Sequence, residues 1–245
     1  MRRLMLAGLM FFASTVFSAE GGGPENRFVY AQLRWQGTWD PYPALWPQIG
    51  RYLQQTTSVV PWPERRTLTV DDPALFESPF LVILGQGAVS FSEAEKERLR
   101  RYIIGGGMIF LDNTEAERNS PFGRSAPALL KSLFPESTWE ALPSDNVVFR
   151  SFFLLRGVGG RRIAEPQLKG LRVQDRLAVL YCANDLHGAL ARDHLGNALF
   201  SCEPGGENQR YESWKLMVNV ILFSLTGTYK TDAIHQPFLE RKAQP

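Results

Sequence analysis

Three continuous apolar runs constrain the fold of this 245-residue chain more than any other feature. They are FLVIL at 80–84, MIFL at 108–111 and LAVLY at 177–181. A strand covered on both faces carries such a run, whereas a half-exposed strand alternates apolar and polar residues. Segments with helical apolar spacing stand between and after these runs. The alternation predicts a mostly parallel sheet with helices on both faces, a three-layer α/β arrangement.

Capping signals help to place the helices. Ser92 and Glu95 form the pattern of a capping box, and the glycines at 105–107 predict where that helix ends. Thr114 and Glu117 repeat the capping-box pattern, ahead of a short helix predicted at 126–133. The other predicted elements are a helix after Pro43, a helix at 211–225, and shorter strands at 28–35, 58–60, 67–70, 147–155 and 197–201.

The N-terminus reads MRRLMLAGLMFFASTVFSA. Two arginines, an apolar stretch and then small residues form the three-part layout of a secretory signal. The apolar stretch is shorter than the roughly 20 residues that a membrane-spanning helix needs. We therefore predict an exported protein, periplasmic or extracellular, with no transmembrane segment after cleavage; the alternative is a retained anchor. The predicted organisation is a signal peptide at 1–19, a linker at 20–27, one domain at 28–228 and a C-terminal extension at 229–245.

Composition and charge exclude two classes of protein. With 44% hydrophobic and 21% charged residues, the chain is far from the composition of disordered proteins. The formal net charge is +2, and removal of Arg2 and Arg3 with the signal leaves it near zero. The arginine pairs at 65–66, 100–101 and 161–162 are scattered, and we expect them to be solvated. Without a basic stripe, nucleic-acid binding is not expected.

Two cysteines, Cys182 and Cys202, leave two alternatives open. In an oxidising compartment they can form a disulfide, and otherwise they are buried free thiols. Neither belongs to a CxxC pair or to a zinc-ligand spacing, so the sequence indicates no structural metal and no cofactor.

Five stretches spread over the chain resemble domain of unknown function family 4159. They are FVYAQLRWQGTWDPYP, LFESPFLVILGQGAVSFSEAEKERLRRYIIGGGMIFLDN, SDNVVFRSFF, DRLAVLYCANDL and VNVILFSLTGTYKTDAIHQPFLERK. The resemblance implies a fold similar to that of class I glutamine amidotransferases, a flavodoxin-like arrangement, but it implies no activity. The chain departs from the family's usual residues at Asn146, where His is common, and at Cys182, where Ser is common.

The implied fold suggests a test for catalysis. Active amidotransferases carry a nucleophilic Cys on the sharp turn after a central strand. The comparable turn here is expected after the strand at 108–111, where Asp112 and Asn113 stand. No G-x-S-x-G elbow occurs either. The sequence therefore leaves catalysis open but favours a non-catalytic role.

Polar residues follow two of the buried strands. Parallel α/β sheets bind ligands at the carboxyl ends of their strands. The candidate ligand-binding residues are therefore Asp112, Asn113, Asn184, Asp185 and His187. Two carboxylates with a nearby imidazole can bind a metal or act as acid and base, although Asp and Asn also cap helices and form turns after strands.

Aromatic residues after the first strand form a second candidate. Trp35, Trp39 and Tyr42 can present rings to a sugar or a partner surface, or they can pack between a strand and a helix. Two functions remain open: a non-catalytic envelope protein that binds a ligand or a partner protein, and a metal-assisted hydrolase that uses Asp112 and Asp185.

The signal prediction has a direct test. Mass spectrometry of the protein recovered from the exported fraction should show a mature N-terminus at Ala19 or Glu20. An intact N-terminus at Met1 in a membrane fraction would show a retained anchor instead.

Overall fold

A computed structural model describes residues 27–231 of the chain. The predicted signal at 1–19, all but one residue of the linker at 20–27, and the extension beyond residue 231 lie outside the described residues.

One sheet organises the domain. Its strands are β1 (Ala31–Leu33), β2 (Arg66–Leu68), β3 (Phe80–Gly85), β4 (Met108–Asn113), β5 (Trp139–Ala141), β6 (Lys169–Val173) and β7 (Arg176–Cys182). Their order is β2-β1-β3-β4-β7-β6-β5. The first five strands in this order are parallel, while β6 and β5 add an antiparallel edge. When only the five parallel strands are counted along the chain, β7 is the fifth and their order across the sheet is 2-1-3-4-5. This is the order of flavodoxin-like sheets, and its topological switch point lies between β1 and β3.

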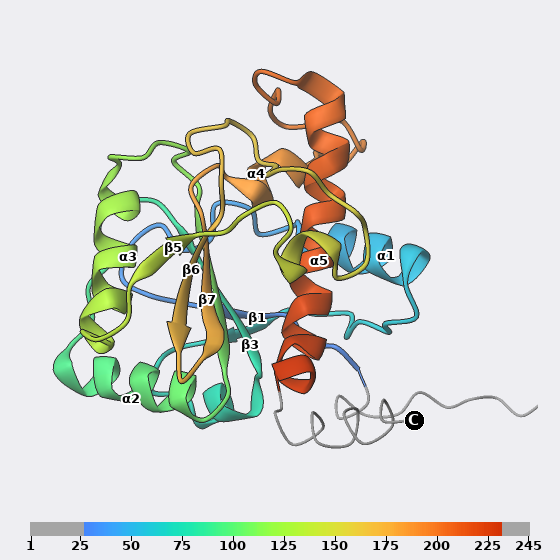
Figure 1. Ribbon diagram of the computed structural model, residues 1–245. Helices are drawn as coiled ribbons and strands as arrows, with labels where there is room; N and C mark the ends of the chain where they lie inside the picture. The colour runs from blue at the N-terminus through green and yellow to red at the C-terminus, as the bar shows by residue number, and fades with distance from the viewer. Residues whose placement is uncertain (1–26, 232–245) are drawn as a thin grey trace, which may run out of the picture.

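Helices cover both faces of the sheet, as the apolar strands predict (Figure 1). The α-helices are α1 (Trp46–Thr56), α2 (Glu93–Ile104), α3 (Pro121–Leu133), α4 (Leu186–Leu190) and α5 (Gly206–Thr231), and short 3-10 helices span Pro73–Glu77 and Val147–Arg150. The helices α1, α4 and α5 pack on one face, and α2 and α3 pack on the other.

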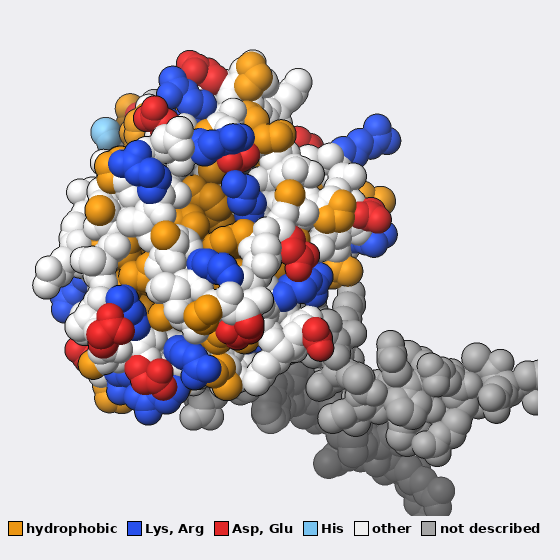
Figure 2. Space-filling model, turned by 60° about the vertical axis from the view of Figure 1, so that its left-hand side comes forward, with side chains coloured by type: hydrophobic (Ala, Val, Ile, Leu, Met, Phe, Trp, Pro, Cys, Tyr) orange, Lys and Arg blue, Asp and Glu red, His pale blue; other side chains and the backbone are white. Residues whose placement is uncertain are grey.

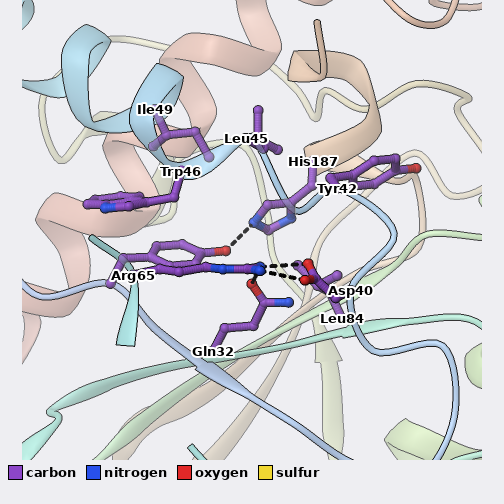
Figure 3. Close-up of a pocket in the computed structure, with 10 residues that line it drawn as sticks. Gln32, Asp40, Tyr42, Leu45, Trp46, Ile49, Arg65, Leu84 and His187 are labelled. Atoms are coloured by element: carbon purple, nitrogen blue, oxygen red, sulfur yellow. Dashed lines mark hydrogen bonds and ion pairs between the residues drawn. The ribbon is translucent and has the colours of Figure 1, made fainter. Parts of the chain in front are cut away.

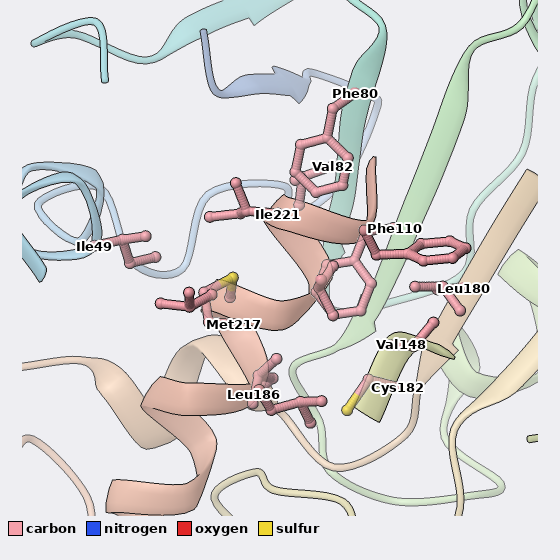
Figure 4. Close-up of a cluster of buried hydrophobic side chains, with 14 of the residues drawn as sticks. Ile49, Phe80, Val82, Phe110, Val148, Leu180, Cys182, Leu186, Met217 and Ile221 are labelled. Atoms are coloured by element: carbon pink, nitrogen blue, oxygen red, sulfur yellow. The ribbon is translucent and has the colours of Figure 1, made fainter. Parts of the chain in front are cut away.

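The core therefore has two halves, one on each side of the sheet. Figure 4 shows the half under α5, where Met217 and Ile221 approach Val82 and Phe110 of the central strands. Each of these side chains is at most 1% exposed. At about 25 cal/mol per Å² of buried apolar surface, such a continuous core is the main favourable term for folding.

The sequence prediction of α2 is confirmed in detail. Ser92 Oγ accepts from the Glu95 amide, and the Glu95 carboxylate accepts from the Ser92 amide at 2.8 Å. The helix ends at Gly105, as the glycines at 105–107 predict.

The second predicted capping box is wrong. The helix after β4 begins at Pro121, and its cap is Ser120, whose Oγ accepts from Gly123 at 3.0 Å. Thr114 instead lies buried at the end of β4, and its hydroxyl bonds to nothing in the described part of the chain. Proline fixes the first helical turn, and this preference outweighs the earlier Thr114–Glu117 pattern.

Several short-strand predictions are also wrong. Residues 58–60 are irregular, 147–155 hold a 3-10 turn, and 197–201 form only one isolated bridge, between Arg192 and Ala198. The antiparallel strands β5 and β6 were not predicted. Short apolar runs do not distinguish a strand from a packed loop, because both bury alternate side chains.

The segment after β1 crosses the carboxyl ends of the strands, held by Trp35. The Trp35 side chain is 6% exposed, and its Nε1 donates to the Leu84 carbonyl at 3.1 Å. Its ring lies against Gly37 and Gly85, where any Cβ would overlap it. The prediction of an aromatic surface is therefore wrong for Trp35, which is a core residue that anchors the chain to β3.

This packing makes a stability prediction for Gly85→Ala. A Cβ at Gly85 would lie 2.2 Å from the Thr38 carbonyl oxygen and 2.7 Å from the Trp35 ring, and the backbone φ is +146°. We expect a loss of about 3 kcal/mol in the free energy of unfolding, measured by urea denaturation. The control is Gly157→Ala, where nothing lies within 4 Å of the new Cβ. Equal stabilities of the two variants would contradict this packing role.

Candidate functional site

The carboxylate of Asp112 lies at the end of β4 and is fully buried. Its Oδ1 accepts from the Leu186 amide at 3.0 Å, and its Oδ2 accepts from the His187 amide at 2.8 Å. The same Oδ2 bonds to His187 Nδ1 at 2.5 Å. Asp112 thus binds the first amides of α4 and the imidazole that α4 carries, which joins β4 to the segment after β7.

The imidazole continues this chain of bonds to the sheet. His187 Nε2 lies 2.7 Å from the hydroxyl of Tyr30, just ahead of β1. With Nδ1 protonated toward Asp112, Nε2 is the acceptor and Tyr30 donates. Tyr30 and His187 are 2% and 1% exposed. Burial, and then the charge of Asp112, raise the pKa of Tyr30 well above its ordinary value, so the phenol stays neutral.

Asp185 forms the turn between β7 and α4. Its backbone is left-handed, with φ 55° and ψ 66°, and its Oδ1 caps α4 by accepting from Gly188 at 2.8 Å. Its Oδ2 bonds to Arg161 Nε at 2.6 Å and to the Tyr42 hydroxyl at 2.8 Å. The sharp strand-to-helix turn therefore follows β7, not β4 as the sequence suggested, and a carboxylate stands on it.

Two neighbouring buried carboxylates disfavour charge on one another. Burial, and then the charge of Asp112, raise the pKa of Asp185 to about 7, against the opposing effect of Arg161. Burial, and then Asp185, also raise the pKa of Tyr42.

The two asparagines of the predicted set are structural. The Asn184 side chain accepts from the Ala164 and Glu165 amides and donates to the Gly159 and Glu165 carbonyls, which fixes the loop at 159–165. Asn113 donates to the Glu117 carbonyl at 2.8 Å and fixes the loop before α3. The structure thus brings together Asp112, Asp185 and His187, while both asparagines hold neighbouring loops.

A small cavity with both polar and apolar walls lies beside this cluster, at the switch point between β1 and β3. Figure 3 shows its lining, in which His187 faces the space from α4 while Arg65 and Asp40 meet across it. The cavity measures about 10 Å³, which is room for one water molecule. Arg65 was expected to be solvated, but its side chain is only 19% exposed. Arg161, expected to be solvated too, is 26% exposed and paired with Asp185.

An open groove lies on the other side of the segment after β1. It has a volume of about 680 Å³ and is lined by Arg34, Trp39, Ser90, Ser92 and further residues of the strand ends. Of the three predicted aromatic residues, Trp39 is half-buried along this groove, and Tyr42 is half-buried at the closed cavity. The crevice at the strand ends is therefore divided into an enclosed part and an exposed part.

Neither cysteine has the surroundings of a nucleophile. Both are free and buried, and burial raises the pKa of Cys182 well above its ordinary value. A thiol in such surroundings stays protonated and inert. Within residues 27–231, no group of three or more His, Cys, Asp or Glu side chains is arranged to hold a metal ion.

Sequence reasoning missed the partners of the predicted residues. Tyr30 stands in the predicted strand at 28–35, but alternation places it on the same side as Gln32 and Arg34, the more polar side, so the pattern carries no signal for its burial. No sequence signal marks Arg65 or Arg161 either, because a buried arginine and a solvated arginine look alike in sequence.

The strand order and the buried polar cluster define a doubly wound α/β domain whose strand-end residues bond chiefly to one another. The chain belongs to the family described as Domain of unknown function (DUF4159), whose model matches residues 27–225, and this confirms the resemblance noted in the sequence. A comparison with curated proteins found no match to the chain. Among the helices of the described residues, none combines the length and the apolar character that crossing a membrane requires.

The raised pKa of Asp185 predicts how stability depends on pH. The folded protein holds this proton up to about pH 7, whereas the unfolded chain releases it near pH 4, so between these values the folded state binds more protons. The free energy of unfolding of the wild type should therefore fall with rising pH, relative to Asp185→Asn. The slope is at most about 1.4 kcal/mol per pH unit. Chemical denaturation at pH 4 to 8 measures it, and a constant difference between the two proteins would contradict the assignment.

Proposed function

We propose that this protein is an exported, non-catalytic envelope protein that acts as a binding or assembly module, with a fold similar to that of class I glutamine amidotransferases. The observation that supports this most is the saturation of the two strand-end carboxylates. Asp112 and Asp185 accept three bonds each from groups of the same chain, and both are 0% exposed. Groups so occupied serve to position α4, not to activate a substrate.

The turn after β7 supports the same proposal. In nucleophile elbows, a strained turn projects a Ser into the site, where a base can reach it. Here the strained residue is Asp185, and its carboxylate turns back to cap α4. The imidazole of His187 already bonds to Asp112 and Tyr30, so it is not free to serve a thiol.

The metal-assisted hydrolase, the second function left open by the sequence, gains no support from this geometry. A divalent metal needs several oxygen or nitrogen ligands directed at one point. The donors to Asp112 and Asp185 are backbone amides, an arginine, a phenol and an imidazole, and these already occupy the carboxylate oxygens.

While the segment after β1 is closed, the exposed groove is the part of the crevice that a ligand or partner can reach. Figure 2 shows one face of the molecule, on which Lys and Arg side chains are interspersed with Asp and Glu. No continuous basic stripe crosses that face, which fits recognition by shape and hydrogen bonding better than recognition of a polyanion.

The decisive variant is Asp112→Asn. Its amide group cannot accept all three bonds, so we expect a loss of about 3 kcal/mol in the free energy of unfolding. Elemental analysis of the purified mature wild type and of the variant should find no stoichiometric divalent metal in either. Asp72→Asn is the control, because Asp72 caps only the 3-10 helix Pro73–Glu77. Stoichiometric metal in the wild type that is lost in Asp112→Asn, with unchanged stability, would favour the hydrolase.

A further inference from the structure

The 36–44 loop, which covers the closed cavity, is attached by a few polar contacts and by the half-buried rings of Trp39 and Tyr42, which pack at the edge of the core. No residue from 36 to 44 is buried. Its attachments are the Gln86 amide to the Thr38 carbonyl, Gln32 Nε2 to the Trp39 carbonyl, Arg65 to Asp40, and Tyr42 to Asp185. A segment that buries little apolar surface and is held by partly exposed hydrogen bonds opens at a low free-energy cost.

The Asp40 side chain extends from this loop into the lining of the cavity, and its carboxylate bonds to Arg65 in the way that a ligand carboxylate could. Arg65 Nη1 donates to Asp40 Oδ1 at 2.6 Å and Nη2 donates to Oδ2, a bidentate pair, while Nη1 also reaches Gln32 Oε1 at 2.8 Å. The guanidinium lies over the Trp39 ring at 5.7 Å. A fork of parallel donors backed by an aromatic ring and an amide is the geometry that recognises a planar carboxylate.

The rest of the lining sets the size and the character of a ligand. Among the residues around the cavity, Arg65 is the one arginine or lysine and Asp40 the one carboxylate. Leu45, Trp46 and Ile49 form an apolar wall, all at most 4% exposed. A ligand whose carboxylate took the place of the Asp40 carboxylate would share this space with the apolar wall, which suits a short apolar chain and offers no partner for a second charge.

We propose that Arg65 is the carboxylate-binding residue of a site for short-chain monocarboxylates, which the 36–44 loop closes by placing Asp40 on it as an internal competitor. This inference rests on the proposed binding role of the strand-end crevice and names its ligand class. The site lies at the topological switch point, where sheets of this order bind ligands. Binding requires the loop to lift, because the closed cavity holds only about one water molecule.

Butyrate is the probe, and butyramide, which has the same shape without the charge, is the matched ligand control. Titration of the mature chain, followed by the fluorescence of tryptophans such as Trp46, should show weak butyrate binding to the wild type. Asp40→Asn removes the tethered competitor and should bind butyrate about tenfold more tightly or better. Arg65→Gln should bind it at least tenfold more weakly than Asp40→Asn, and butyramide should bind to none of them.

Glu140→Gln is the control for breaking an arginine–carboxylate pair elsewhere. It disrupts the exposed Arg172–Glu140 pair of β5 and β6 and should leave butyrate affinity at the wild-type value. Equal butyrate affinities of wild type, Asp40→Asn and Arg65→Gln, or no binding to a folded Asp40→Asn, would overturn the proposal.

Hydrogen exchange keeps the test decisive if Asp40→Asn does not fold. In the wild type, saturating butyrate should raise amide exchange in the 36–44 loop several-fold, and butyramide should not. Unchanged exchange would overturn the inference. Such a failure would leave the proposed non-catalytic role standing, because that role is tested by metal content and by the stability of Asp112→Asn.

Discussion

The buried carboxylate of Asp112 is the contact on which the arrangement of the strand ends depends. It accepts from two amides of α4 and from the His187 imidazole, and so joins β4 to the segment after β7 and, through Tyr30, to the start of β1. A buried carboxylate is stable only when such donors replace water. Because the helix start and the imidazole share this one acceptor, and the phenol bonds to the same imidazole, none can move independently of the others.

This arrangement explains why the strand-end residues look functional in sequence but bond inward in the structure. Asp185 caps α4 and holds Arg161 and Tyr42, so two loops distant in sequence close over the cluster. The space left for a ligand is then set by the segment after β1, which leaves a closed cavity on one side and an open groove on the other. On the proposed function, binding at this edge would depend on the 36–44 loop and on Arg65, and not on the carboxylates of Asp112 and Asp185.

Much of the fold was predictable because the central strands are covered on both faces. The runs at 80–84 and 108–111 correspond closely to β3 and β4, and the Ser92 capping box placed α2. The edge strands β5 and β6 escaped prediction because their residues mix polar and apolar types without a clear period. Asp112, Asp185 and His187 were predicted from their place after strands, whereas Arg65 and Tyr30 reach the site through tertiary packing that no local pattern records.

The account can be tested most directly at the His187 imidazole, through its ¹⁵N chemical shifts in the mature chain. It predicts a proton on Nδ1 facing Asp112, an acceptor Nε2 facing Tyr30, and shifts that stay unchanged when Zn²⁺, Mn²⁺ or Mg²⁺ is added. If adding a divalent ion moved the ¹⁵N chemical shift of either ring nitrogen to a value typical of metal coordination, or removed the Nδ1 proton, that result would contradict the structural role of this cluster.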